Sequence, residues 1–231
     1  MTVHVSVIVP CHDAARYIDE ALASVAAQGV PDLEVLVIDD GSTDDSAAVA
    51  ARHGGAVRVH SQPNAGAAAA RNRGLELARG ALVAFLDADD VWTPNSLGDR
   101  LAALDAEPDA GYAAGLVQQF VSPDFPAESR SHLAEFVEVS AGRVAGGMLV
   151  RRSVIESVGH FDAAYRSGEV IDWVARADAA GVRAALVPRV VLRRRIHAAN
   201  STRRNARLPG DYLRMLRSSI ARQRPATDVT Q

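Results

Sequence analysis

Hydrophobic and polar positions follow a regular order along the first hundred residues of the chain. Short apolar runs alternate with segments whose apolar residues recur every three or four positions. Such runs predict buried strands, and the helical period predicts amphipathic helices. We expect strands at 3–9, 33–38, 57–60 and 81–86, and helices at 14–28, 44–53, 65–78 and 94–104. This alternation predicts an α/β protein with a doubly wound, mostly parallel sheet.

The pattern becomes less regular after residue 107. It predicts strands at 110–121, 134–139, 147–150 and 184–196, and helices at 153–158, 171–180 and 208–222. We therefore expect one domain, 1–231, with an N-terminal half (1–107), a smaller second region (108–222) and a flexible tail (223–231). In the first half, Asp13 and Asn64 stand where helix N-caps would lie.

Composition excludes several classes of function. The chain of 231 residues has a formal net charge of −3, which gives no sign of nucleic-acid binding. It contains no lysine, so it has neither a Walker-type phosphate loop nor a lysine Schiff base. The single cysteine, Cys11, excludes an internal disulfide and fits a reducing compartment. With neither a leader sequence nor a continuous apolar span in the sequence, we expect a cytoplasmic protein.

Positive charge is concentrated near the C-terminus. Residues 189–224 contain eleven arginines and one acidic residue, Asp211. Such a segment favours contact with an anionic ligand or with the periphery of a membrane surface. Solvated helix faces explain the same charges, and the pattern does not choose between the two.

Acidic residues follow three of the predicted strands. The strand ends read PCHD at 10–13, DDGS at 39–42 and DADD at 87–90. In a doubly wound sheet, ligands bind beyond the carboxyl ends of the strands. Asp13 or Ser42 alone could be a helix cap, but capping does not use three carboxylates. A cation shared with a diphosphate relieves their repulsion, which predicts Mg²⁺ or Mn²⁺. A dinucleotide fingerprint is missing after the first strand, which argues against hydride transfer.

Four blocks of the N-terminal half occur together in a fixed order: SVIVPCHDAARYIDEALASVAAQ, VLVIDDGSTDDS, NAGAAAARNRGLELARG and FLDADD. In residues and spacing they resemble a family 2 glycosyltransferase with the GT-A fold. The C-terminal half resembles the family more loosely, through GGMLVRR, FDAAYRSGEVIDW and RRRIHAAN. The resemblance implies metal-dependent, inverting transfer of a sugar from a nucleoside diphosphate sugar, with a UDP-sugar expected, to an acceptor hydroxyl. That acceptor is a glycan, a lipid-linked compound or a natural product.

The resemblance also implies roles for single residues. The nucleotide would be bound by Pro10, His12, Asp40, Arg71, Asp87 and Arg195. The metal would be bound by Asp87, Asp89 and His197. The family has an aromatic residue and an asparagine after the proline, where this chain has Cys11 and His12, so the preference for uracil stays open.

A second departure concerns the catalytic base. The family has a Glu-Asp pair whose second residue is the base, whereas this chain reads Glu169-Val170. Glu169 and Asp172 are the remaining candidates, with Glu169 slightly favoured. Both could instead be acids that stabilise a helix N-terminus. An inactive relative that only binds nucleotide is the alternative function.

Overall fold

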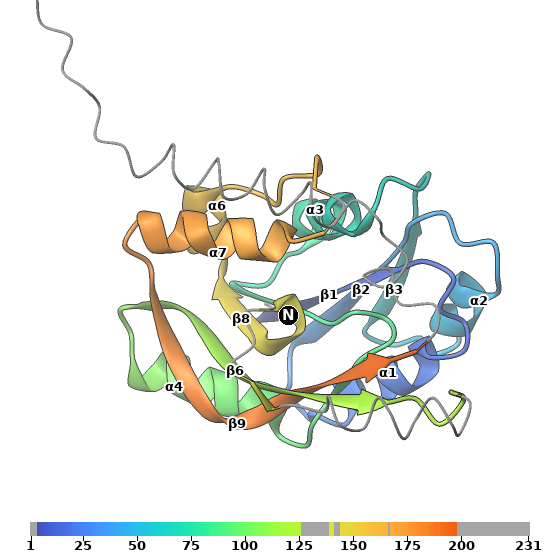
Figure 1. Ribbon diagram of the computed structural model, residues 1–231, viewed down its shortest axis with the longest axis horizontal. Coiled ribbons are helices and arrows are strands. Elements are labelled where there is room, and N and C mark those ends of the chain that lie inside the picture. Colours follow the sequence, from blue (N-terminus) through green and yellow to red (C-terminus); the bar gives the residue numbers. More distant parts are fainter. Residues whose placement is uncertain (1–3, 126–138, 141–143, 166, 198–231) are drawn as a thin grey trace, which may run out of the picture.

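The computed structural model describes residues 4–125, 139–140, 144–165 and 167–197, and these form one α/β unit (Figure 1). The helix predicted at 208–222, the tail and almost all of the strand predicted at 134–139 lie outside the described residues. Of the helices in the described ranges, none is long and apolar enough to cross a membrane.

The N-terminal half has the predicted alternation of strands and helices. Its strands run parallel in the order β3-β2-β1-β4: Val5–Cys11 (β1), Leu33–Asp39 (β2), Val57–Ser61 (β3) and Leu82–Phe85 (β4). Its helices are Ile18–Ala26 (α1), Ser46–Ala51 (α2), Ala67–Leu77 (α3) and Ser96–Ala106 (α4). The central strand β1 is almost wholly buried, as its unbroken apolar run predicts.

All four helices of this half begin two to four residues later than predicted, and the two cap predictions are wrong. Asp13 has a left-handed backbone (φ 47°), and its carboxylate accepts hydrogen bonds from Thr43 instead of capping α1. The N-cap of α3 is Gly66, at φ 95°, and not Asn64. In both places a neighbouring loop, which the local sequence does not show, determines the helix start.

The second region continues the same sheet with mixed strand directions. Its elements are Ala110–Val121 (β6), Val139–Ser140 (β7), Ala145–Gly147 (η1), Met148–Arg151 (β8), Arg152–Val158 (α6), Glu169–Ala179 (α7) and Arg183–Ile196 (β9). A short strand of the N-terminal half, Val91–Trp92 (β5), pairs with β9 at the end of this part of the sheet. The order continues β4-β8-β6-β9-β5, and β7 pairs with β6. β8 runs antiparallel to β4 and β6, and β9 runs parallel to β6. The register between β6 and β9 shifts beside Pro188, which has no N–H to donate.

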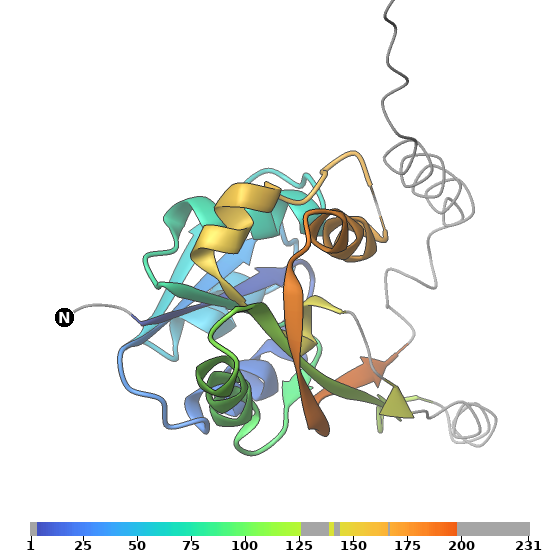
Figure 2. The same cartoon turned by 90° about the vertical axis from the view of Figure 1, so that its left-hand side faces the viewer.

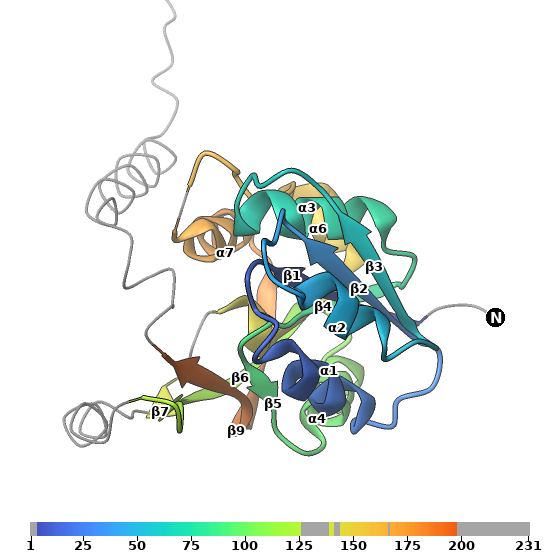
Figure 3. The same cartoon turned by 90° about the vertical axis from the view of Figure 1, so that its right-hand side faces the viewer.

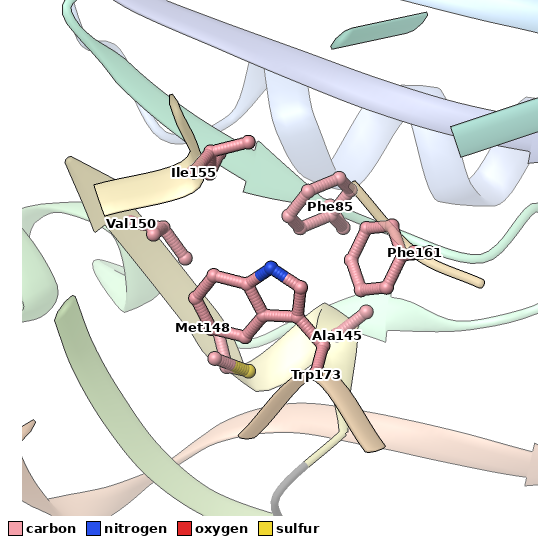
Figure 4. Close-up of a pocket in the computed structure, with 7 residues that line it drawn as sticks. All are labelled: Phe85, Ala145, Met148, Val150, Ile155, Phe161 and Trp173. Carbon is pink, nitrogen blue, oxygen red and sulfur yellow. The ribbon is translucent and has the colours of Figure 1, made fainter. Parts of the chain in front are cut away.

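Helices cover both faces of the sheet (Figures 2 and 3). One apolar layer lies between the sheet and α1, α2 and α4, and the other lies under α3, α6 and α7. Trp173 of α7 is 2% exposed and donates its indole N–H to the carbonyl of Gly159 at 2.9 Å. It lines a small apolar hollow in the second layer (Figure 4), together with Phe85, Ala145, Met148, Val150, Ile155 and Phe161. This packing fixes α7 over the end of β4.

Gly74→Ala should lower the free energy of unfolding, although alanine is the better helix former. A Cβ at this position of α3 would collide with the side chain of Ile8, which is fully buried on β1. Overpacking of this kind costs about 1–3 kcal/mol. Chemical denaturation monitored by circular dichroism would measure the change.

Gly98→Ala is the matched control, since this glycine also lies inside a helix, α4. Its Cβ would meet only the end of the Asn95 side chain, which can rotate away. The higher helix propensity of alanine should then leave the free energy of unfolding unchanged or raise it by up to about 1 kcal/mol. Equal destabilisation by the two substitutions would contradict the packing of α3 on β1.

Candidate active site

The acidic strand ends meet at one edge of the sheet. β1, β2 and β4 are parallel neighbours, with Cys11 beside Asp39 and Ile8 beside Phe85. Ligands of doubly wound sheets bind at this edge. The loops after these strands therefore supply the side chains of the candidate site.

Arg71 of α3 is the charged centre of this edge. Its side chain is 5% exposed, and its Nη2 donates to Oδ1 of Asp87 at 2.6 Å. Its Nη1 donates to Oε1 of Glu169, in the first turn of α7. Burial alone would lower the pKa of Arg71, but the two carboxylates outweigh burial and raise it. One permanent cation therefore joins an acid of the N-terminal half to an acid of the second region.

Asp89 turns to a different partner. Its Oδ2 lies 2.8 Å from Nε2 of His197, which follows β9. Within the described ranges, no group of three or more acidic, histidine or cysteine side chains is arranged to hold a metal ion. Asp89 and His197 still fit Mn²⁺ or Mg²⁺, because such ions use few protein ligands and complete their shell with phosphate oxygens and water.

Asp90, the third acid after β4, fastens this loop to β9. It is 4% exposed, and its Oδ1 accepts the backbone N–H of Arg195 at 2.8 Å. Burial raises the pKa of Asp90 well above its ordinary value, and the nearby charges of Asp89 and Asp87 add to the rise. The sequence cluster is thus three acids with three separate sets of contacts.

Arg195 is itself almost buried, at 5% exposure. Its Nε donates to the carbonyl oxygen of Asp89 at 2.8 Å, and its Nη2 donates to the carboxylate of Glu20. Its guanidinium thus has partners within the chain, and the predicted contact with a diphosphate stays a prediction.

Asp40 holds the loop between β3 and α3. Its Oδ1 accepts from Nε2 of Gln62 at 2.7 Å and from the N–H of Ala65 at 2.9 Å, and its Oδ2 accepts from the N–H of Gly66 at 2.8 Å. These bonds satisfy backbone donors that precede α3. A base N–H would have to share this carboxylate or displace one of its donors.

Pro10 and His12 lie on either side of Cys11 at the end of β1. Pro10 pairs with Ile38 of β2, whereas the His12 side chain is 43% exposed and its Nδ1 lies 3.6 Å from a carboxylate oxygen of Asp13. Burial raises the pKa of Cys11 to about 12, so this thiol is no nucleophile. His12 and the adjacent Asp13 are therefore the accessible side chains at this strand end.

The two candidate bases lie in different surroundings. Glu169 shares Arg71 with Asp87, whereas Oδ2 of Asp172 accepts from Nε of Arg176 at 2.9 Å. Arg176 also donates to the carbonyls of Val158 and His160, at 2.6 and 2.7 Å. Asp172 therefore ties α7 to the segment after α6, and Glu169 is the acid that belongs to the Arg71 cluster.

Sequence reasoning missed several residues that shape this edge. Gln62 contacts Asp40, Glu20 pairs with Arg195, and the Tyr17 ring lies 4.6 Å from the ring of His197. Tyr17 and Glu20 lie inside the first motif block, but no local pattern connects them to residues about 180 positions away in the sequence. Only the folded sheet brings them together.

Comparison with known proteins gives the class of this chain. The profile of Glycosyl transferase family 2 matches residues 6–166, so the chain belongs to this family. The succinoglycan biosynthesis protein ExoU of Rhizobium meliloti is 37% identical over 205 residues, which is 78% of this chain and 58% of ExoU. The putative teichuronic acid biosynthesis glycosyltransferase TuaG of Bacillus subtilis is 41% identical over 101 residues, 42% of this chain and 40% of TuaG. The chain spans less than two thirds of the length of these relatives.

Solved structures confirm the GT-A fold. TarS of S. aureus (residues 1–349), in complex with UDP-GlcNAc, superposes with a TM-score of 0.75 at 21% identity, over 95% of this chain and 66% of that one. The mannosyltransferase PcManGT of Pyrobaculum calidifontis, in complex with GDP-Man and Mn²⁺, gives 0.72 at 25% identity, over 94% and 64%. The family and the fold predicted from the motifs are therefore confirmed.

Proposed function

We propose that this chain transfers a sugar from a nucleoside diphosphate sugar to an acceptor hydroxyl. One observation carries the proposal: Arg71 binds both Asp87, beside the predicted metal site, and Glu169, on the acceptor side. The proposed base for the acceptor and one acid of the donor side thus meet at one cation. TarS binds UDP-GlcNAc and PcManGT binds GDP-Man, which supports a nucleotide-sugar donor.

The proposed donor is a UDP-sugar whose base lies against Pro10 and His12. A carboxylate offers about four lone-pair positions. Asp40 uses three of them on the loop between β3 and α3, so one remains for a base N–H. This fourth position on the Asp40 carboxylate fits a hydrogen bond from the N–H of uracil and equally one from the N–H of guanine.

Asp89 and His197, with Asp87 beside them, are the proposed ligands of Mn²⁺ or Mg²⁺. PcManGT carries Mn²⁺ together with its donor, which supports this assignment. A bound divalent ion would offset the negative charge that grows on the departing diphosphate. The chain holds these proposed ligands close together, since Nε2 of His197 lies 2.8 Å from Oδ2 of Asp89.

Glu169 is the proposed base for the acceptor proton. Arg71 keeps the carboxylate of Glu169 oriented. Glu169 then accepts the proton as the acceptor oxygen attacks the anomeric carbon, and the bond to the diphosphate breaks on the opposite side. Such a direct displacement inverts the anomeric centre.

The acceptor remains a proposal at the level of chemical class. ExoU is named for succinoglycan biosynthesis, which favours a glycan over the lipid-linked and natural-product alternatives. The Arg-rich segment 189–224 is the proposed site of contact with a membrane periphery, and most of it lies outside the described residues.

A nucleotide-binding module without transfer activity is the second candidate. Val170, where the family has its acidic base, is 9% exposed and packs in the apolar layer under α7. Such a module would bind the donor but neither transfer nor hydrolyse it. An assay for nucleoside diphosphate released from a nucleoside diphosphate sugar therefore distinguishes the transferase from the binding module.

Glu169→Gln should slow sugar transfer about 10²–10⁴-fold, the usual loss for a general base, while UDP affinity stays unchanged. The amide keeps an oxygen for Arg71 but accepts no proton. Transfer rates and calorimetric UDP affinity would both be measured. Asp172→Asn, on the same helix, is the matched control and should affect stability more than rate. Slow transfer in the control with a normal rate in Glu169→Gln would move the base to Asp172.

UDP should bind more tightly with Mn²⁺ than in EDTA, because the ion joins the diphosphate to Asp89 and His197. Titration calorimetry under the two conditions measures the difference. Asp89→Ala should remove most of it, whereas Asp109→Ala, a control at a side chain that is 88% exposed, should not. Equal UDP affinity in Mn²⁺ and in EDTA for the unaltered chain would show that the acids bind no metal.

A further inference from the structure

The side chain of Arg195 contacts two aromatic rings. Its guanidinium carbon is 5.1 Å from the centre of the Tyr17 ring and 4.7 Å from that of Phe120. Tyr17 precedes α1 and Phe120 belongs to β6, so the two rings come from distant parts of the chain. Stacking on aromatic rings fixes the plane of a guanidinium and limits its rotation.

The donors of Arg195 are directed at the loop that carries the predicted metal ligand. Nε binds the carbonyl of Asp89 at 2.8 Å, and the backbone N–H binds Oδ1 of Asp90 at 2.8 Å. Nη2 binds the carboxylate of Glu20, which balances the charge. The arginine therefore holds two successive residues of this loop.

The same contacts extend to His197. This residue lies two positions after Arg195, its ring packs 4.6 Å from the Tyr17 ring, and its Nε2 lies 2.8 Å from Oδ2 of Asp89. Tyr17 is in turn fixed by its hydroxyl, which donates to Asp124 at 2.8 Å. Asp89 and His197, which are far apart in the sequence, are thus placed by one set of stacked side chains.

We propose that Arg195 is a positioning residue that sets Asp89 and His197 for a divalent cation, rather than a ligand of the donor's diphosphate. The proposal rests on the proposed function of the site. Its physical basis is that the buried guanidinium binds Asp89 and Glu20 while it also contacts the Tyr17 and Phe120 rings. Lysine cannot replace it, because an ammonium group lacks the planar fork and the stacking surface.

The test compares UDP binding with and without Mn²⁺ in Arg195→Met, Arg195→Lys and the matched control Arg193→Met. Arg193 lies on the same strand and contacts the same Phe120 ring, at 4.4 Å. A partner that orients metal ligands is worth about 10–100-fold in metal affinity. Both Arg195 variants should therefore weaken Mn²⁺-dependent binding at least about tenfold, leave binding in EDTA unchanged and differ from the control.

Glu20→Gln gives an independent reading, since this carboxylate is 58% exposed and its loss should not unfold the chain. If Arg195 positions the metal ligands, removing its counter-charge weakens Mn²⁺-dependent binding. If Arg195 instead binds phosphate, the same change releases the guanidinium and strengthens UDP binding in EDTA, which would overturn the proposal. Retention of Mn²⁺ dependence in Arg195→Met, at the level of Arg193→Met, would also overturn it.

Failure of the proposed function gives a different result. If the unaltered chain binds neither UDP nor GDP, with or without Mn²⁺, the site is no donor site. The proposed role of Arg195 is then wrong as well. If the unaltered chain binds UDP and the Arg195 variants lose affinity equally in EDTA and in Mn²⁺, the donor site stands and Arg195 is a phosphate ligand.

Discussion

The pairing of Arg71 with Asp87 and Glu169 is the interaction on which the candidate site depends. A guanidinium that is 5% exposed is costly to bury unless carboxylates pair with it. Those carboxylates come from the end of β4 and from the start of α7, so one cation requires the two halves of the domain to meet. The packing of Trp173 in the apolar layer beneath α7 supports the same placement.

The loop after β4 is fixed from a second side by β9. Asp87 faces Arg71, whereas Asp89 and Asp90 bind side-chain and backbone groups of Arg195 and His197. Like charges at such close spacing repel, and separate partners reduce that cost. The acids therefore hold a defined arrangement in the chain itself. This is the pre-organisation that a site for a metal and a diphosphate needs, since groups held in place need not reorganise during reaction.

Much of the architecture was readable from the sequence because it follows from local periodicity. The strand predicted at 110–121 is β6 as observed, and the four apolar runs of the first half are β1–β4. Helix starts were less predictable. Asp13 and Asn64 have the chemistry of caps, but Thr43 binds the first, and Gly66 takes the place of the second. Where these helices start therefore depends on the loop that packs against each N-terminus, and the local sequence does not show that loop.

The site was predictable in its residue types and less so in its contacts. Strand-end acids could be read as ligand-binding groups, and the motif blocks placed Arg71 and His197 among them. The pairing of Arg195 with Glu20 could not be found, because it joins residues that are 175 positions apart through side chains alone. The separation of Glu169 from Asp172 likewise depends on Arg176, whose role appears only once α6 and α7 are packed together.

The coupling between Arg71 and Glu169 is the most direct test of this account. A double-mutant cycle would measure the free energy of unfolding of Arg71→Met, Glu169→Ala and the double variant. Residues in direct contact couple by about 0.5–3 kcal/mol, and distant residues add within about 0.5 kcal/mol. We predict that the double variant is less destabilised than the sum of the single ones by at least about 1 kcal/mol. Additive effects would contradict the claim that one buried cation joins Asp87 to Glu169, the proposed base.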